Sequence, residues 1–316
     1  MLLGGLEARR GFQQYSPMSR LLFVTLSNIG DLVLTTPALM ALHAAFPHAR
    51  VDIVADRRSS ELLRHSPFLG TLFHRDKQAG IPGLLRLLRE LRRTRYDAVI
   101  DLRTDWLPMV IRARQWSSRR RANARAEHSA AQHLEVVSAL LGNSCNLPPA
   151  RVWFDRPHEA RARELLAGLP GRRLVIAPGA NWAPKCWPAG HFAACANHLR
   201  DAFDSLVVLG GPADVPVAAA LRTATTQPLL DLAGQTSLCE AAAVLHQCSA
   251  FIGNDSGLGH IAAAVGLPVV TVFGPGNPAR YRPWGTRTAV CLAPENELAQ
   301  LDPAVVAGQL RQLLTD

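Results

Sequence analysis

The sequence lacks several features that would assign it to a common class. Its 316 residues contain no uninterrupted apolar run of about 18 residues, the length that a membrane-spanning helix needs. Its six cysteines form no C-x-x-C pair, a pattern that favours reduced thiols over a zinc site. Aromatic residues make up 6%, without an RNP-like or helix-turn-helix signature. We therefore expect a cytoplasmic protein with no transmembrane segment, no metal and no nucleic-acid partner.

Two familiar nucleotide-binding fingerprints are also missing. No G-x-G-x-x-G follows the first strand-like run, and no G-x-x-x-x-G-K-[ST] occurs anywhere in the chain. These absences argue against an ordinary dehydrogenase and against a P-loop ATPase. Glycines gather instead in turns of the second half, for example at 210–211, 253, 257 and 259. Any nucleotide would therefore have to bind through turns of another kind.

The composition is that of a globular protein, with 48% hydrophobic and 19% charged residues, and the length suits two domains. The net charge is +9, and arginines concentrate in segments 86–95 and 112–125. These segments are either solvated helix faces or attract an anionic partner, such as a membrane surface or an acidic glycan. We expect residues 1–17 to be a flexible extension, because the first strand-like run begins only after Met18.

Short apolar runs alternate with helical patterns along most of the chain. Runs such as Leu21–Leu26 and Leu174–Ala177 are typical of buried parallel strands, and each is followed by a segment with helical spacing. The alternation is interrupted at 142–158, which contains several prolines. We therefore predict an α/β fold of two Rossmann-like, doubly wound parallel-sheet domains that face a cleft. The predicted units are 18–155, 156–300 and a closing helix within 301–316.

The run FIGNDSGLGHIAAAVG, residues 251–266, places polar residues between a strand and a helix. A helix start exposes free backbone N–H groups and the positive end of the helix dipole, which favours anion binding. Asp255 could orient the glycine turn or accept a sugar hydroxyl, and His260 could donate to a phosphate. In the alternative interpretation, Asp255 and Ser256 are only helix caps and His260 is a surface histidine.

Lys185 and Asp31 occupy comparable positions after other strands. Lys185, in the turn of APGANWAPKCWP, is a point charge suited to phosphate oxygens. Asp31, in TLSNIGDLVLTTPAL, is either a capping aspartate or a general base that faces the cleft.

Taken together, these motifs resemble glycosyltransferase family 9, the ADP-heptose:lipopolysaccharide heptosyltransferases. The opening LLFVTLSNIGDLVLTTPAL and the segment GNDSGLGHIAAAVGLPVVTVFGPGNP carry most of the likeness, and YDAVIDLR and PGANWAPKCWP match two further blocks. The resemblance runs over nearly the whole chain from residue 20. It implies the GT-B fold, with the acceptor mainly on the first domain and a nucleotide sugar on the second. It also implies that the closing helix within 301–316 crosses back toward the first domain.

The resemblance also assigns roles to individual residues. It implies that Asp31 is the catalytic base of an inverting, metal-independent transferase. It assigns donor contacts to the residues Asn181, Lys185, Thr236, Asp255, Ser256, Gly257, Leu258 and His260. The family often carries Thr or Glu in the turn before the lysine, whereas this chain has Ala180, Asn181 and Trp182 there.

The function implied is transfer of a heptose or related sugar from an ADP-sugar to a lipopolysaccharide core hydroxyl, without a cofactor. The arginine-rich first half suits an acidic glycolipid acceptor at the inner-membrane surface. Three alternatives stay open: transfer to a soluble acceptor such as an antibiotic core, a GT-B-type epimerase, and a non-catalytic nucleotide-binding protein.

Overall fold

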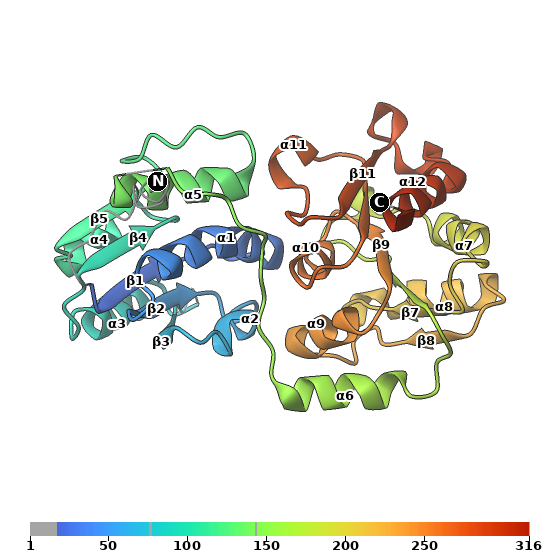
Figure 1. Ribbon diagram of the computed structural model, residues 1–316, viewed down its shortest axis with the longest axis horizontal. Coiled ribbons are helices and arrows are strands. Elements are labelled where there is room, and N and C mark those ends of the chain that lie inside the picture. The colour runs from blue at the N-terminus through green and yellow to red at the C-terminus, as the bar shows by residue number, and fades with distance from the viewer. Residues whose placement is uncertain (1–17, 76–77, 143, 316) are drawn as a thin grey trace, which may run out of the picture.

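The computed structural model describes residues 18–75, 78–142 and 144–315, so the extension expected at 1–17 lies outside the described residues. The chain forms two lobes, each built on one parallel β-sheet with helices packed against it (Figure 1). This is the predicted α/β architecture, and it arises because continuous apolar runs form strands that are buried on both faces.

The sheet of the first lobe has five strands in the order β3-β2-β1-β4-β5, and every pair is parallel. The order reverses between β1 and β4, so the carboxyl ends of these two strands flank a crevice where ligands commonly bind. The strands are β1 (Arg20–Val24), β2 (Arg50–Ala55), β3 (Leu69–His74), β4 (Ala98–Asp101) and β5 (Gln115–Ser118).

Five helices belong to the first lobe: α1 (Ile29–Ala45), α2 (Glu61–Arg64), α3 (Gly80–Leu91), α4 (Leu107–Ile111) and α5 (Ser129–Leu141). Pro37 lies well inside α1. A proline cannot donate to the carbonyl four residues earlier. The Thr36 hydroxyl donates to that carbonyl of Val33 instead, at 2.7 Å. The helix therefore continues through the proline.

The sheet of the second lobe has six strands in the order β11-β10-β9-β6-β7-β8, again all parallel. Here the order reverses between β6 and β9. The strands are β6 (Arg173–Ala177), β7 (Ser205–Val208), β8 (Leu229–Asp231), β9 (Ala250–Asn254), β10 (Val269–Phe273) and β11 (Thr288–Leu292).

The helices that follow the crossing into the second lobe are α6 (Arg156–Leu166), α7 (Ala189–His198), α8 (Val215–Ala224), α9 (Leu238–His246), α10 (Gly257–Ala264), α11 (Pro278–Tyr281) and α12 (Pro303–Thr315). Short 3-10 turns are η1 (Ala183–Lys185), η2 (Pro212–Asp214), η3 (Pro294–Asn296) and η4 (Leu298–Gln300). Ser237 caps α9 by accepting from Glu240 N at 3.1 Å.

The closing helix α12 corrects one expectation. It was expected to cross back toward the first domain, but it packs on α7, β10 and β11 of the second lobe. Its buried residues Val306, Ala307 and Leu310 join the core of the second sheet. The apolar face of α12 is therefore buried against its own lobe, and the helix does not need to cross to the first lobe to bury it.

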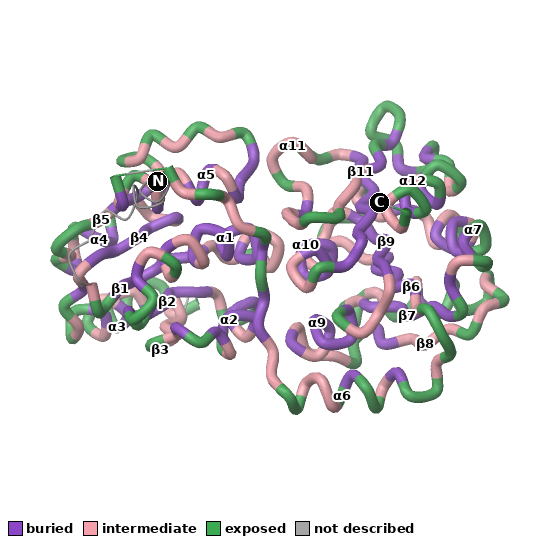
Figure 2. Tube along the Cα trace, viewed as in Figure 1, coloured by how far each residue is buried: buried purple, intermediate pink, exposed green. Residues whose placement is uncertain are grey.

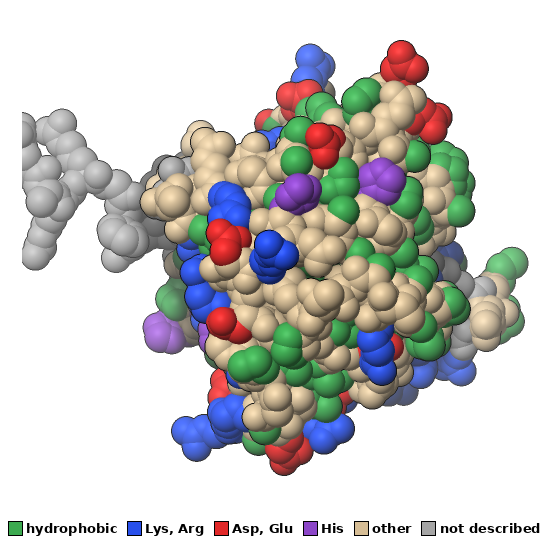
Figure 3. Space-filling view, turned by 90° about the vertical axis from the view of Figure 1, so that its right-hand side faces the viewer, with side chains coloured by type: hydrophobic (Ala, Val, Ile, Leu, Met, Phe, Trp, Pro, Cys, Tyr) green, Lys and Arg blue, Asp and Glu red, His purple; other side chains and the backbone are tan. Residues whose placement is uncertain are grey.

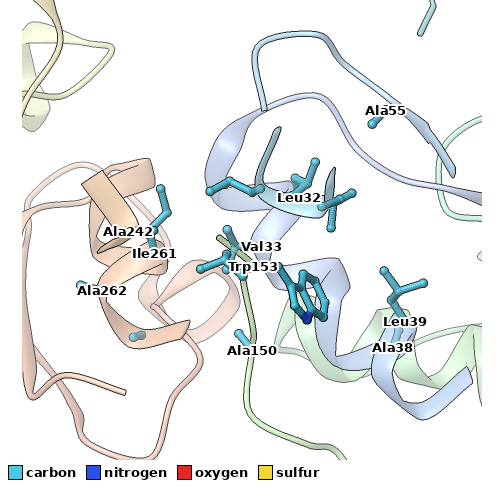
Figure 4. Close-up of a cluster of buried hydrophobic side chains, with 14 of the residues drawn as sticks. Leu32, Val33, Ala38, Leu39, Ala55, Ala150, Trp153, Ala242, Ile261 and Ala262 are labelled. Atoms are coloured by element: carbon cyan, nitrogen blue, oxygen red, sulfur yellow. The ribbon is translucent and has the colours of Figure 1, made fainter. Parts of the chain in front are cut away.

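The two lobes share a hydrophobic cluster at their junction. Helices α1 and α10 pack against each other, and Val33 and Ile261 are fully buried there beside Trp153 (Figure 4). Figure 2 shows that the central strands of both sheets are also buried, whereas α6 alternates between exposed and covered positions. Burial of apolar surface is the main favourable contribution to folding, so this contact helps to hold the two lobes together.

The surface of the second lobe is electrostatically mixed at its far end, where basic and acidic side chains are interspersed (Figure 3). Within the part of the chain that the structure describes, none of the helices combines the length and the apolar character needed to cross a bilayer.

Candidate active site

The predicted site residues leave the sheets beside the two points where strand order reverses. Asp31 follows β1, Lys185 follows β6, and Asp255 follows β9. A cavity of about 420 Å³ lies between the lobes at these strand ends. It is lined by Ser27, Asn28, Ile29, Gly30, Asp31, Leu34 and Arg58 of the first lobe and by Asn181, Lys185, Asp255, Ser256, Gly257, His260 and Tyr281 of the second.

Asp31 is the carboxylate that the first lobe presents to this cavity. It is the third residue of α1, and the N-cap position is taken by Asn28. The Asn28 side-chain amide donates to Asp31 Oδ2 at 2.9 Å, which holds the carboxylate at the cavity wall. Asp31 therefore does not cap the helix, and it is half-buried where a substrate hydroxyl could reach it.

Lys185 and Asp255 form an ion pair on the opposite wall. Lys185 Nζ lies 2.5 Å from Asp255 Oδ2, and the two side chains are 24% and 12% exposed. The pair joins the loop after β6 to the loop after β9, although the residues are 70 positions apart. A cation held in a partly covered site is screened less than one on the open surface, so it is well suited to bind an anion.

Asn254, at the end of β9, fixes the loop that carries Lys185. Its side chain is fully buried, donates to Pro178 O at 2.6 Å and accepts from Trp187 N at 2.9 Å. The segment between these two partners contains both Asn181 and Lys185. Asn254 therefore acts as a positioning residue for the basic side of the cavity, a role that the sequence alone did not identify.

The start of α10 forms the floor of the cavity. Ser256 occupies the N-cap position, but its side chain accepts no cap hydrogen bond, and its buried hydroxyl has no partner among the described residues. The first backbone N–H groups of α10 are therefore not satisfied by a capping side chain. Together with the helix dipole, they create a favourable position for a phosphate.

His260 is buried, with 5% of its surface exposed, and is not the surface histidine of the alternative interpretation. Burial, helped by His128 and Lys185 nearby, lowers the pKa of His260 to about 4. The ring is therefore neutral at physiological pH. It can donate or accept a hydrogen bond, but it contributes no positive charge to the cavity.

Two glycines allow the helix starts of the two lobes to approach each other. A Cβ atom added at Gly30 would lie 2.7 Å from His260 Cδ2, and one added at Gly257 would lie 2.8 Å from Ile29 Cβ. Both distances are shorter than real side chains tolerate, so residues with a side chain would push α1 and α10 apart. The glycines thereby bring Asp31 and the start of α10 to one cavity.

The structure brings together seven of the nine predicted site residues. Thr236 and Leu258 are not among the residues that line the cavity, and Leu258 packs against the hydrophobic core instead. Arg58 and Tyr281 also line the cavity but were not predicted, because each lies outside the polar turns from which the candidate residues were chosen. Arg58 is 69% exposed and forms an ion pair with Asp56 at 3.0 Å.

The profile of glycosyltransferase family 9 (heptosyltransferase) matches residues 84–308, which is most of the chain. The protein belongs to this family. It is therefore a glycosyltransferase, and the two facing lobes are the GT-B architecture that the sequence predicted.

Known relatives support the assignment over most of the protein. Lipopolysaccharide heptosyltransferase 3 of Escherichia coli K12 is 29% identical over 283 residues, covering 81% of this chain and 82% of the relative. Among solved structures, the family 9 glycosyl transferase of Veillonella parvula has a TM-score of 0.85 at 24% identity, covering 94% of this chain and 97% of that one. The E. coli heptosyltransferase WaaC with ADP has a TM-score of 0.76 at 23% identity, covering 93% and 99%.

Proposed function

We propose that this glycosyltransferase moves a heptose from an ADP-linked donor to a hydroxyl of a lipopolysaccharide core acceptor. The observation that carries the proposal is the single cavity that joins Asp31 of one lobe to Lys185, Asp255 and the start of α10 in the other. A heptosyltransferase relative and a neighbour described with ADP support the sugar and the nucleotide.

In the proposed reaction, the Asp31 carboxylate removes a proton from the acceptor hydroxyl. The acceptor oxygen attacks the anomeric carbon from the face opposite the nucleotide, the bond to the diphosphate breaks, and the configuration inverts. Asn28 keeps the carboxylate oriented through its 2.9 Å hydrogen bond. A base must lie within hydrogen-bond reach of its proton, and the position of Asp31 on the cavity wall supports this role.

The departing diphosphate gains charge in the transition state, and the second lobe offers the groups that stabilise it. Lys185 supplies a positive charge, and the start of α10 supplies backbone N–H groups and its dipole. Binding of the donor would draw Lys185 toward phosphate and leave Asp255 free to accept a hydroxyl of the sugar. We propose that these groups fulfil the role that a divalent cation plays in other transferases.

The acceptor would enter from the first lobe. Arg58 lines that side of the cavity, and the arginine-rich segments 86–95 and 112–125 belong to the same lobe. Clustered positive charge raises the local concentration of an anionic substrate such as a phosphorylated, carboxylate-bearing glycolipid. We therefore propose that the protein works on the cytoplasmic side of the inner membrane, at its surface.

The test combines donor binding with transfer. The melting temperature of the purified protein is measured with ADP, UDP or GDP. A separate, unheated sample is incubated with ADP-heptose and lipopolysaccharide from a strain that lacks core heptose. We expect selective stabilisation by ADP and an increase in acceptor mass by one heptose, without added metal. Stabilisation by UDP or GDP alone would overturn the donor assignment.

The same assay separates the competing functions. Binding of ADP without transfer to any acceptor would identify a non-catalytic nucleotide-binding protein. Release of nucleotide and free sugar without an acceptor would indicate an epimerase. Transfer that occurs only to a soluble acceptor would keep the enzyme class and replace the glycolipid.

A further inference from the structure

Three residues that commonly bind transition metals meet at the junction of the lobes, outside the cavity described above. His65 follows α2 of the first lobe, His158 lies in the first turn of α6, and Cys239 lies in α9 of the second lobe. Helix α9 packs on both α2 and α6, which brings these three elements side by side (Figure 1). None of the three residues lines the cavity that holds Asp31.

The three side chains converge closely. One ring nitrogen of each histidine and Cys239 Sγ all lie within 4.8 Å of one another. A tetrahedral zinc site, with metal–ligand bonds of about 2.0 to 2.3 Å, separates its ligand atoms by about 3.3 to 3.8 Å. Small rotations of the side chains would therefore close the cluster around an ion, without a change in the backbone.

A carboxylate lies next to both imidazoles. His65 Nδ1 is 3.5 Å from Asp155 Oδ2, and His158 Nδ1 is hydrogen-bonded to Asp155 Oδ1. The carboxylate also caps α6, which accounts for its contact with His158. Capping does not account for the approach of His65 and Cys239, which come from other parts of the chain. A carboxylate that orients two imidazoles is the usual support of a histidine-bound metal.

We propose that His65, His158 and Cys239 bind a Zn²⁺-type cation, with Asp155 orienting the two imidazoles. Imidazole and thiolate are ligands that Zn²⁺ prefers, whereas Mg²⁺ and Ca²⁺ prefer oxygen atoms. The histidine side chains are 27% and 24% exposed, which gives an ion access from solvent, while Cys239 is 1% exposed and closes the inner side.

The bound ion would link the two lobes. His65 belongs to the first lobe, and Cys239 belongs to the second, where its thiol also faces the carbonyl of Glu61 at 3.3 Å. The neighbouring Leu238 N–H donates to the Glu61 carboxylate across the same junction. A metal here would restrict hinge motion between the lobes and would take no part in sugar transfer. The proposal therefore does not depend on the proposed function.

The test uses Co²⁺ as a spectroscopic substitute for Zn²⁺. The full chain, freed of metal and kept reduced with a phosphine, is titrated with Co²⁺. We expect one equivalent to produce the visible bands of tetrahedral cobalt and the ultraviolet band of thiolate-to-cobalt charge transfer. Zn²⁺ should then displace the cobalt and remove both bands. Absence of these bands in the unmodified protein would overturn the proposal.

Two variants and one control locate the site. Cys239→Ser should lose the charge-transfer band, and His65→Asn should weaken cobalt binding at least tenfold. The control Cys145→Ser should keep both the charge-transfer band and the affinity for cobalt. Zn²⁺ should raise the melting temperature of the unmodified protein and of Cys145→Ser, but not that of His65→Asn. Circular dichroism checks folding, and His65 is the safer variant because it is partly exposed. Retention of the charge-transfer band in folded Cys239→Ser would place the ion elsewhere and overturn the proposal.

Discussion

At the scale of single residues, the cavity depends on side chains whose charge and orientation are set by one or two neighbours. Asn28 orients Asp31, and Asp255 pairs with Lys185. Asn254 fixes the loop between Pro178 and Trp187 by hydrogen bonds to both of these residues. The chain has only two lysines, at 77 and 185, among 34 basic residues. A compact ammonium group at 185 fits beside Asp255 and leaves donor protons free for a second acceptor.

Asp31→Asn should lower turnover about a hundredfold or more, because an amide cannot accept the proton of the acceptor hydroxyl. The substitution keeps the size of the side chain, so stabilisation by ADP and the melting temperature should stay near their normal values. Initial rates of ADP release with donor and acceptor give the measurement. Glu164→Gln, an exposed change on α6, is the control. Near-normal turnover in Asp31→Asn would exclude its role as the base.

The buried histidines predict loss of stability in mild acid. Burial lowers the pKa of His133 to about 3 and that of His260 to about 4, against 6.5 in the unfolded chain. As the pH falls below about 6.5, these two rings become protonated in the unfolded chain but stay neutral in the folded protein. The free energy of unfolding therefore decreases. The decrease continues until the pH reaches the native pKa values. Above pH 7 these two rings should have no effect.

Urea unfolding at pH 7.5 and pH 5 measures this dependence. His133 should account for about 2 kcal/mol of the difference between the two pH values. Both of its ring nitrogens lack hydrogen-bond partners among the described residues. His133→Leu should therefore show a smaller loss at pH 5 than the unmodified protein. His48→Gln, which changes an exposed ring, should show the full loss. Equal losses in all three proteins would contradict the assignment.

At the scale of elements, the close contact of α1 and α10 determines the site. The two helix starts meet through Gly30 and Gly257, and the apolar faces behind them pack Val33 against Ile261. The contact directs the positive end of α10 and the carboxylate of α1 into the same space. A small separation of these helices would therefore affect stability and catalysis together.

Gly30→Ala should reduce the free energy of unfolding by about 1 to 3 kcal/mol, because its Cβ would overlap the His260 ring. Gly308→Ala in α12 is the matched control, since a Cβ there has no atom within 4 Å. Alanine favours a helix over glycine by about 0.5 to 1 kcal/mol, so the control should be unchanged or more stable. Thermal unfolding compares the two, and an unaffected Gly30→Ala would show that the helices can separate at no cost.

At the scale of the whole molecule, one hydrophobic cluster runs through both lobes. It extends from strands of the first sheet through Val33, Trp153 and Ile261 to the helices of the second lobe. Further contacts lie at the rim, where His128 Nε2 bonds to Arg282 O at 3.0 Å. We therefore expect the two lobes to unfold together, even though each has its own sheet.

Ile261→Ala should lower the stability of the entire protein by about 2 to 5 kcal/mol, because it removes fully buried atoms from the shared cluster. The denaturation curves from circular dichroism and tryptophan fluorescence should shift together and stay coincident. Val305→Ala, at a position 57% exposed on α12, should change stability by less than about 0.5 kcal/mol. Two separate transitions, with only one of them shifted, would show that the lobes are independent.

Edge strands mark the limit of what hydrophobic patterns predicted. The central strands β1, β6 and β9 were anticipated, because burial on both faces requires continuous apolar runs. The strands β3, β5 and β11 were not, since all three lie at sheet edges and include half-covered or exposed side chains. An edge strand has one neighbour and needs no continuous apolar run, so its sequence carries a weaker signal.

The sequence by itself determined the alternation of strands and helices and the polar turns at the strand ends, because both follow from interactions between residues close along the chain. It therefore predicted two facing parallel sheets and the candidates Asp31, Lys185 and Asp255. Only the tertiary structure decided that His260 is buried and neutral and that α12 stays on its own lobe. It also brought His65 and Cys239 together. Such outcomes depend on how distant segments pack, and packing is set by the shapes of all the contacting elements at once.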